Sequence, residues 1–240
     1  MSNIEKFLEM VQESDNIVFF GGAGVSTESG IPDFRSVDGL YNQKYDYPPE
    51  TILSHTFYMR HTEEFYRFYR DKMLCLDAKP NVTHQKLAEL EAAGKVKAVI
   101  TQNIDGLHQM AGSRRVLELH GSVHRNYCQK CGKGFDAEYI LKSGTEISLC
   151  DACGGKIKPD VVLYEEGLNQ QTLEDAVFYI SHADVLIIGG TSLAVYPAAG
   201  LIDYYRGNKL VLINKSTTPM DGRADLLIQA GLGEVFSQIR

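Results

Sequence analysis

The chain has 240 residues, of which 44% are hydrophobic. This length and composition are typical of one globular domain, with or without a small insert, and they allow a sizeable core. The formal net charge of −7 disfavours broad binding to the phosphate backbone of nucleic acids. The same charge is compatible with basic partners such as lysine-bearing proteins.

The N-terminal segment has no basic stretch followed by an apolar run, so it predicts no signal peptide. No stretch approaches the roughly eighteen apolar residues that cross a bilayer, so we expect no membrane span. We therefore expect a cytoplasmic protein. Cytoplasmic thiols stay reduced, and paired cysteines there are typical of a metal site rather than of disulfides.

Short apolar runs alternate with segments of helical spacing along most of the chain. In chain order, they predict a helix over 4–12, a strand over 16–20, a long loop over 31–55, helices over 56–74 and 81–93, strands over 97–101, 116–119 and 161–164, a helix over 173–180, a strand over 184–189, a helix over 197–205, and strands over 209–213 and 225–228. Continuous apolar strands that alternate with helices indicate an α/β fold, with a mostly parallel sheet and helices on both faces.

Residues 122–158 interrupt this pattern, because glycine, cysteine and lysine punctuate them and no long apolar period is present. We interpret them as a small inserted module. The larger domain then comprises residues 1–121 and 159–240, and the segment 31–75 contributes to the smaller one.

The inserted module carries two pairs of cysteines with CxxC spacing, Cys128 with Cys131 and Cys150 with Cys153. This spacing places two thiolates on one side of a tetrahedral ion, and a second pair closes the site. Four sulfur ligands leave no open position for water. The sequence therefore predicts one structural Zn²⁺ rather than a catalytic metal or a redox dithiol.

A glycine-rich loop, Gly21–Gly24, directly follows the first predicted strand. Glycines there let the backbone approach a pyrophosphate, and the N-terminus of a following helix favours the anion, which predicts a dinucleotide on a Rossmann-like fold. A tight turn without a ligand is the plainer alternative for this loop alone. Thr27 stands at the third glycine position of the fingerprint, and no acidic residue closes a second strand about twenty residues further on. A dehydrogenase that transfers hydride is therefore disfavoured.

Polar side chains follow several other predicted strands, at Gln102–Asp105, His120, Thr191–Ser192 and Asn214. The carboxyl ends of strands are where open α/β sheets bind ligands. We therefore expect these residues to lie at the same edge of the sheet as the glycine loop.

Five stretches occur in a characteristic order: GVSTESGIPDFRS (24–36), TQNIDGLH (101–108), LHGS (119–122), GGTSL (189–193) and INK (213–215). With them, the chain resembles the sirtuins, which are NAD-dependent protein-lysine deacylases, over nearly its whole length. The two cysteine pairs stand in the place of the family's zinc module. The resemblance implies NAD as a co-substrate and acetyl-lysine proteins as partners.

The resemblance also implies roles for individual residues. His120 is the expected general base: the acyl oxygen attacks C1′ of the ribose and expels nicotinamide, and the histidine then takes the proton of a ribose hydroxyl. Asn103 is assigned to catalysis beside it. The residues expected to hold NAD are Ala23, Gly24 and Thr27 at the pyrophosphate, Phe34 and Arg35 in a loop over the nicotinamide, Gln102 with Asn103 at the nicotinamide ribose, Ile104 and Asp105 at the carboxamide, Thr191 and Ser192 at the phosphates, Asn214 at the adenosine ribose and Leu232 near the adenine.

The substrate backbone is expected to pair, as an added strand, with Val161, Leu163 and Tyr164. Glu165 replaces the glycine that the family has next. The extra carboxylate predicts a preference for substrates with basic residues near the acyl-lysine.

Sirtuins that remove succinyl groups carry Tyr-x-x-Arg in the aromatic helix, whereas this chain has Tyr66 followed by Tyr69. Arg70 is one position off, about 100° around the helix. The resemblance therefore predicts an uncharged acyl group, with acetyl first.

Other functions stay open at this point. Mono-ADP-ribosyl transfer, or removal of other uncharged acyl groups, would use the same site. A zinc ribbon that binds nucleic acid or protein is a different class of function. It is disfavoured because the basic residues of the module form no long run and lack interleaved aromatic residues. We expect a monomer.

Overall fold

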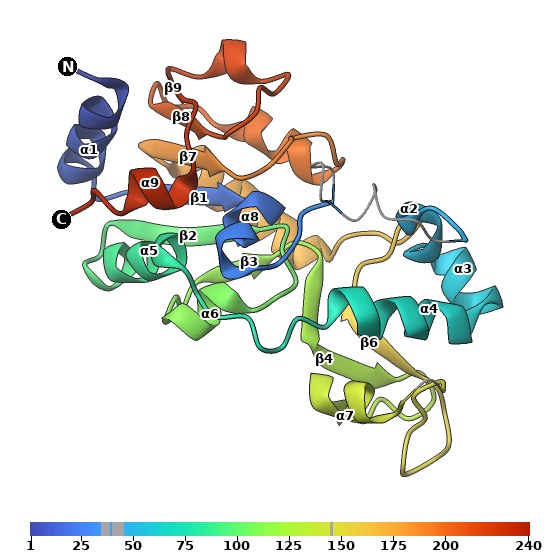
Figure 1. Ribbon diagram of the computed structural model, residues 1–240. Helices are drawn as coiled ribbons and strands as arrows, with labels where there is room; N and C mark the ends of the chain where they lie inside the picture. The colour runs from blue at the N-terminus through green and yellow to red at the C-terminus, as the bar shows by residue number, and fades with distance from the viewer. Residues whose placement is uncertain (35–38, 40–45, 145) are drawn as a thin grey trace.

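The computed structural model describes residues 1–34, 39, 46–144 and 146–240 (Figure 1). Six parallel strands form the large sheet, in the order β3-β2-β1-β7-β8-β9. They are β1 (Ile17–Gly21), β2 (Val96–Thr101), β3 (Val116–Glu118), β7 (Val185–Gly189), β8 (Leu210–Ile213) and β9 (Leu226–Ile228). The order reverses between β1 and β7, which is where open α/β sheets bind ligands. The predicted fold class and these six strands are confirmed.

Helices cover both faces of the large sheet because its central strands are apolar on both sides. All residues of β1 and β7 are buried, and the successive side chains Phe19 and Phe20 enter separate core clusters on opposite faces. Such burial contributes roughly 25 cal/mol per Å² of apolar surface. One face is covered by α1 (Asn3–Glu13), α5 (Val82–Ala92) with α6 (Leu107–Ala111) beside it, and α9 (Leu232–Phe236), and the other by α8 (Gln170–His182) and the 3₁₀ helix Ala198–Tyr204.

The small sheet lies at one end of the molecule and carries the cysteine pairs (Figure 1). In it, β4 (Gly121–Cys128) pairs antiparallel with both β5 (Gly134–Phe135) and β6 (Ile157–Val161). Aromatic side chains, with Phe65 and Tyr66 fully buried, form a third core cluster against these strands. The helices that contribute to this cluster are α2 (Pro49–Ile52), α3 (His55–Arg60), α4 (Thr62–Phe68) and α7 (Ala137–Lys142).

The aromatic helix predicted over 56–74 is broken in the structure. α3 ends at Arg60, His61 takes φ −127° and ψ 49°, and α4 begins at the next residue. A π-helical turn, Tyr69–Met73, follows α4. Across the break, the rings of Tyr58 in α3 and Phe65 in α4 meet edge to face, with centroids 5.0 Å apart. Packing of aromatic rings in the third cluster thus overrides a continuous helical spacing.

The strand predicted over 161–164 is wrong in position and in partner. β6 ends at Val161 and belongs to the small sheet. Beyond it, the N–H of Tyr164 donates to the carbonyl of Leu53, and the carbonyl of Tyr164 accepts from the N–H of His55, each at 2.9 Å. Tyr164 therefore does not continue the pairing with β4, because its backbone N–H and carbonyl are bonded to Leu53 and His55 at the start of α3.

Several helical segments differ from the prediction. The helix expected after the glycine loop is a pair of 3₁₀ turns, Ala23–Val25 and Thr27–Ser29. So short a turn carries little macrodipole, and anion binding there must depend on individual N–H groups. The helix predicted over 197–205 is a 3₁₀ helix, and α9 had no predicted counterpart. None of the helices in the described part of the chain is long and apolar enough to cross a membrane.

Candidate active site

A cavity of about 610 Å³ opens at the carboxyl ends of β1, β2, β7 and β8. The large sheet lines it with residues 22–24, 102–105, 190–192 and 213–215, which follow these strands. The segment 161–166, at and after the end of β6, lines the cavity as well. Loops of the large sheet and the chain that leaves the small sheet therefore contribute to one site, and its volume suits a cofactor together with part of a substrate.

Nearly every residue predicted to act at the site lines this cavity. Arg35 lies outside the described residues. Ser26, which the sequence analysis did not single out, lines the cavity as well, and its place between Gly24 and Thr27 was the available signal. The predicted residues that the cavity brings together are His120, Asn103, Ala23, Gly24, Thr27, Phe34, Gln102, Ile104, Asp105, Thr191, Ser192, Asn214, Leu232, Val161, Leu163 and Tyr164.

The glycine loop is packed directly against the loop after β7. The N–H of Gly24 donates to the carbonyl of Gly190 at 2.8 Å. A Cβ at Gly24 would lie 2.7 Å from the Cα of Gly190, which is closer than two such atoms can approach. Glycine is therefore required at position 24 by contact between two loops, in addition to any approach of a pyrophosphate.

The carboxylate of Asp105 is oriented by three neighbouring groups. The hydroxyl of Ser26 donates to its Oδ2 at 2.6 Å, and the N–H of Leu107 donates to its Oδ1 at 2.9 Å. The amide of Asn103 donates in turn to the Ser26 oxygen at 3.0 Å. These bonds fix a carboxylate that lines the cavity, so it can accept from a ligand amide without prior rearrangement.

The imidazole of His120 is placed by the backbone of the loop after β2. Its Nδ1 lies 2.9 Å from the carbonyl oxygen of Gln102, and because that oxygen can only accept, Nδ1 carries the hydrogen. In the neutral ring the lone pair is then on Nε2. Burial lowers the pKa of His120, and the bond to Gln102 opposes this only in part. The ring is therefore neutral at neutral pH and able to act as a base.

The loops after β7 and β8 are joined through one amide side chain. Asn214 accepts from the N–H of Thr191 at 3.2 Å and donates to its carbonyl at 2.8 Å. Gln102 donates to the Thr191 hydroxyl at 3.0 Å. Three predicted cofactor-binding residues therefore also form the frame of the cavity.

The four cysteines of the small sheet lie together, with all Sγ atoms within 4.8 Å of one another. The Sγ atoms of Cys128 and Cys153 are 3.4 Å apart, and those of Cys131 and Cys150 are 3.7 Å apart. A tetrahedral zinc with Zn–S bonds of 2.3 Å needs sulfur atoms about 3.8 Å apart. The cluster therefore fits one Zn²⁺ with four thiolate ligands and no place for water.

The sequence model of the Sir2 family matches residues 22–197. The chain belongs to the Sir2 family. The predicted resemblance to the sirtuins is confirmed, since this match spans the glycine loop, the residues after β2, His120 and the cysteine cluster.

Individual Sir2 proteins resemble the chain over almost its full length. The NAD-dependent protein deacetylase of Clostridium acetobutylicum is 61% identical over 241 residues, which cover 100% of this chain and 98% of that protein. A solved Sir2 with a deacetylated p53 peptide and 3′-O-acetyl-ADP-ribose superposes with a TM-score of 0.90, at 42% identity, over 98% of this chain and 96% of that one. A Sir2 complex with a p53 peptide and NAD⁺ gives a TM-score of 0.86 at 41% identity, over 100% and 97%.

Glu165, which by the sequence resemblance stands in place of a glycine, has an unusual backbone conformation. Its φ of +76° lies in the left-handed region, where glycine is at ease and other residues are strained by roughly 1–2 kcal/mol. Its carboxylate accepts from the N–H of Thr56, in the first turn of α3, at 2.8 Å. The neighbouring Glu166 bonds His55 at 2.8 Å and Lys158 at 3.0 Å. The two carboxylates thus fasten the predicted peptide-binding segment to α3 and β6.

Tyr69, which the resemblance places at the arginine position of the succinyl-removing sirtuins, lines the cavity. Its hydroxyl is fully buried and has no hydrogen-bond partner among the described residues, and burial raises its pKa well above the ordinary value. Arg70 points into the small module, where its guanidinium donates to Ile140 at 2.8 Å and to Ser148 at 2.9 Å. Lys72 of the same turn lines the cavity and is paired with Asp71 at 3.0 Å.

Proposed function

We propose that this Sir2-family chain is an NAD-dependent protein-lysine deacetylase. It transfers the acetyl group of acetyl-lysine to the ADP-ribose part of NAD, and it releases nicotinamide, O-acetyl-ADP-ribose and free lysine. The observation that carries the proposal is the setting of His120, which lines the cavity as a neutral ring with Nδ1 bonded to Gln102. Its Nε2 is then the atom that takes the proton of a ribose hydroxyl.

The remaining roles follow the lining of the cavity. Asp105 and Ile104 hold the carboxamide of nicotinamide, and the bonds from Ser26 and Leu107 support this role because they orient the carboxylate in advance. Asn103 acts beside His120 on the nicotinamide ribose. The other predicted cofactor-binding residues hold the phosphates and the adenosine, and Val161, Leu163 and Tyr164 take the substrate backbone.

We propose an uncharged acyl group, with acetyl first. Burial raises the pKa of Tyr69, so its phenol stays neutral, and a phenol cannot supply the positive charge that an arginine would bring. Arg70, the nearest guanidinium in sequence, is occupied by Ile140 and Ser148. Among the described residues that line the cavity there is no guanidinium to bind a free carboxylate at the end of the acyl chain in bidentate fashion, and the ammonium of Lys72 is paired with Asp71.

The four cysteines would hold Zn²⁺ without contributing to the chemistry. When bound, the ion supplies a fixed crosslink between the end of β4 and the turn before β6. All catalytic work falls to side chains of the cavity.

Mass spectrometry of an acetyl-lysine peptide incubated with NAD tests this function. We expect loss of the acetyl group and appearance of O-acetyl-ADP-ribose only with NAD, and a drop of about 10²–10⁴-fold in rate for His120→Ala. ADP-ribose attached to protein in place of O-acetyl-ADP-ribose would favour mono-ADP-ribosyl transfer. Faster turnover of a succinyl-lysine peptide would contradict the acyl preference.

We also propose that the chain acts as a monomer and does not bind nucleic acid. The net charge of −7 supports the second part. Light scattering after size exclusion, and retention on a DNA column at low salt, would test the two parts separately.

A further inference from the structure

Strand β4 connects His120, which lines the cavity, to Cys128 of the cysteine cluster. It begins at Gly121, directly after His120, and ends at Cys128. Between these ends, two residues of β4 bond to the loop that follows β2 in the large sheet. The N–H of Val123 donates to the carbonyl of Ile104 at 3.0 Å, and Nε2 of His124 lies 2.9 Å from the carbonyl oxygen of Asp105.

Asp105 is consequently bonded from both sheets. Ser26, after β1, donates to its carboxylate, and His124, on β4, donates to its backbone carbonyl. A carbonyl oxygen only accepts, so Nε2 of His124 carries the hydrogen in this bond. The two bonds together fix both the side chain and the peptide plane of this residue.

The residue after Asp105 explains why the peptide plane needs a partner. Gly106 has a φ of +73°, and glycine has the widest choice of backbone conformations. The His124 ring lies against it, since a Cβ at Gly106 would be 2.7 Å from Cδ2 of the ring. Loss of His124 would therefore remove both the partner of the Asp105 carbonyl and the ring that lies over Gly106.

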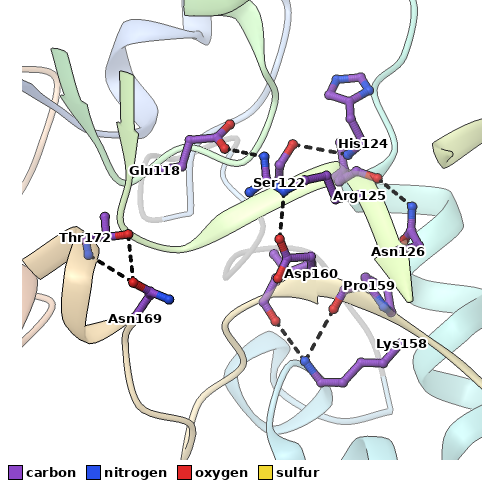
Figure 2. A network of polar contacts seen from close by, with 12 residues as sticks. Glu118, Ser122, His124, Arg125, Asn126, Lys158, Pro159, Asp160, Asn169 and Thr172 are labelled. Carbon is purple, nitrogen blue, oxygen red and sulfur yellow. Dashed lines mark hydrogen bonds and ion pairs between the residues drawn. The ribbon is translucent and has the colours of Figure 1, made fainter. Parts of the chain in front are cut away.

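His124 stands apart from the ion pairs of its neighbour. Figure 2 shows Arg125 between Glu118 and Asp160, with the His124 ring pointing away from Asp160. The side chain of His124 is exposed. The His124 ring is therefore not part of a hydrophobic core, and its contacts are those with Asp105 and Gly106.

We propose that His124 is a positioning residue for the nicotinamide end of the site. This inference rests on the proposed function, in which Asp105 holds the carboxamide. By fixing the peptide plane of Asp105, His124 keeps the carboxylate in the orientation that accepts from the carboxamide NH₂. Its loss weakens the binding of nicotinamide and of NAD and leaves the binding of the acetyl-lysine peptide unchanged.

Two substitutions separate the hydrogen bond from the shape of the ring. His124→Phe keeps a ring over Gly106 and removes the donor, whereas His124→Gln places an amide NH₂ near the position of Nε2. His182→Phe is the matched control, because His182 is an exposed histidine at the far end of α8 that bonds Phe178. The inhibition constant of nicotinamide, the KM values for NAD and for the peptide, kcat and the melting temperature are measured for each variant.

We expect His124→Phe to raise the inhibition constant of nicotinamide and the KM for NAD by about two- to tenfold, the usual effect of one lost hydrogen bond. The KM for the peptide should stay constant, and His124→Gln should recover most of the loss. A nicotinamide constant for His124→Phe equal to that of His182→Phe overturns the inference, as does an equal loss for His124→Gln.

Asp105→Asn distinguishes failure of this inference from failure of the proposed function. If Asp105→Asn weakens nicotinamide and His124→Phe does not, only the positioning role of His124 is wrong. If Asp105→Asn leaves nicotinamide binding unchanged, the assigned role of Asp105 is wrong and the inference falls with it.

Discussion

In the large sheet, all 5 residues of β1 are buried, whereas β6 of the small sheet alternates between buried and half-buried residues. The small sheet compensates with specific contacts. Arg125 of β4 bonds Glu118 at 2.7 Å and Asp160 at 2.8 Å (Figure 2). The cysteine cluster lies at the other end of β4, which finishes at Cys128. Both sheets contribute to one cavity, and the small sheet depends, in addition to its aromatic core cluster, on bonds that single substitutions or a chelator can remove.

The difference has a consequence for function. The bonds of the small sheet reach the site directly, because His120 precedes β4 and His124 lies within it. In the proposed function, residues after the strands of the large sheet hold the cofactor, and the proposed role of the small sheet is to orient Asp105 through His124. Perturbations of the two sheets should therefore separate in experiment.

Removal of zinc should have the largest effect. Structural zinc contributes apparent binding free energies of about 10–16 kcal/mol in zinc-finger peptides. We expect Cys150→Ala to lose the metal and the activity, with faster amide hydrogen exchange in β4 and β6 and little change in β1 and β7. Metal content, deacetylation and hydrogen exchange are the measurements.

Cys75→Ala is the control for the cysteine variant, since this thiol lies outside the cluster. If loss of zinc accelerated hydrogen exchange equally in both sheets, the large sheet would depend on the metal as much as the small sheet does. The contrast between the two sheets would then be wrong.

Acid should affect the large sheet instead. His84 and His108 lie side by side in α5 and α6, with ring centroids 4.7 Å apart, and His108 packs near Phe19 of β1. Burial lowers the pKa of His84 to about 4 and that of His108 to about 3, and in the second case the neighbouring histidine adds to the effect. Both rings are therefore neutral in the folded protein at neutral pH.

The sign of the pH effect follows from linkage. In the unfolded chain a histidine titrates near 6.5, so below about pH 6.5 the unfolded state binds protons that the folded state does not. Stability is thus present above about pH 6.5 and is lost as pH falls towards the folded pKa values. Each histidine should lower the free energy of unfolding by about 2 kcal/mol between pH 7 and pH 5.

Urea unfolding of wild type and His108→Leu at both pH values checks this expectation. Neither ring nitrogen of His108 has a partner among the described residues, so leucine should be tolerated at pH 7. The variant should lose about 2 kcal/mol less than wild type on acidification. If wild type and His108→Leu lost the same free energy of unfolding between pH 7 and pH 5, the role of the buried pair would be contradicted.

The smallest effect on stability is expected from substitution of Glu165, in the segment after β6. Glycine there relieves the left-handed strain but removes the bond to Thr56, so the free energy of unfolding should change by less than about 1 kcal/mol. Glu165→Gln keeps an oxygen for the Thr56 N–H and removes the charge.

If the charge selects substrates, both Glu165 variants should raise the KM for acetyl-peptides with flanking lysine or arginine, with little effect on neutral peptides. Equal effects on both kinds of peptide would count against a role in selection. An effect of glycine alone would point to the backbone conformation instead.

The sequence alone determined the features that depend on residue type and local spacing. Continuous apolar runs predicted the six strands of the large sheet, because burial on both faces leaves no polar alternation. The spacing of Cys128, Cys131, Cys150 and Cys153 predicted a cluster that fits zinc, because the ligand chemistry is local to each pair. His120 was predicted to be the general base from its motif and from its place after a strand.

Only the tertiary structure decided which groups meet. The backbone bonds of Tyr164 to Leu53 and His55 join residues distant in sequence, and the break at His61 accompanies the packing of Tyr58 on Phe65 within the third core cluster. The bonds of Ser26 and His124 to Asp105 join residues 79 and 19 positions apart, and no periodicity encodes them. Hydrophobic spacing specifies which face of an element is buried, whereas the partner across that face is chosen by packing of the whole chain.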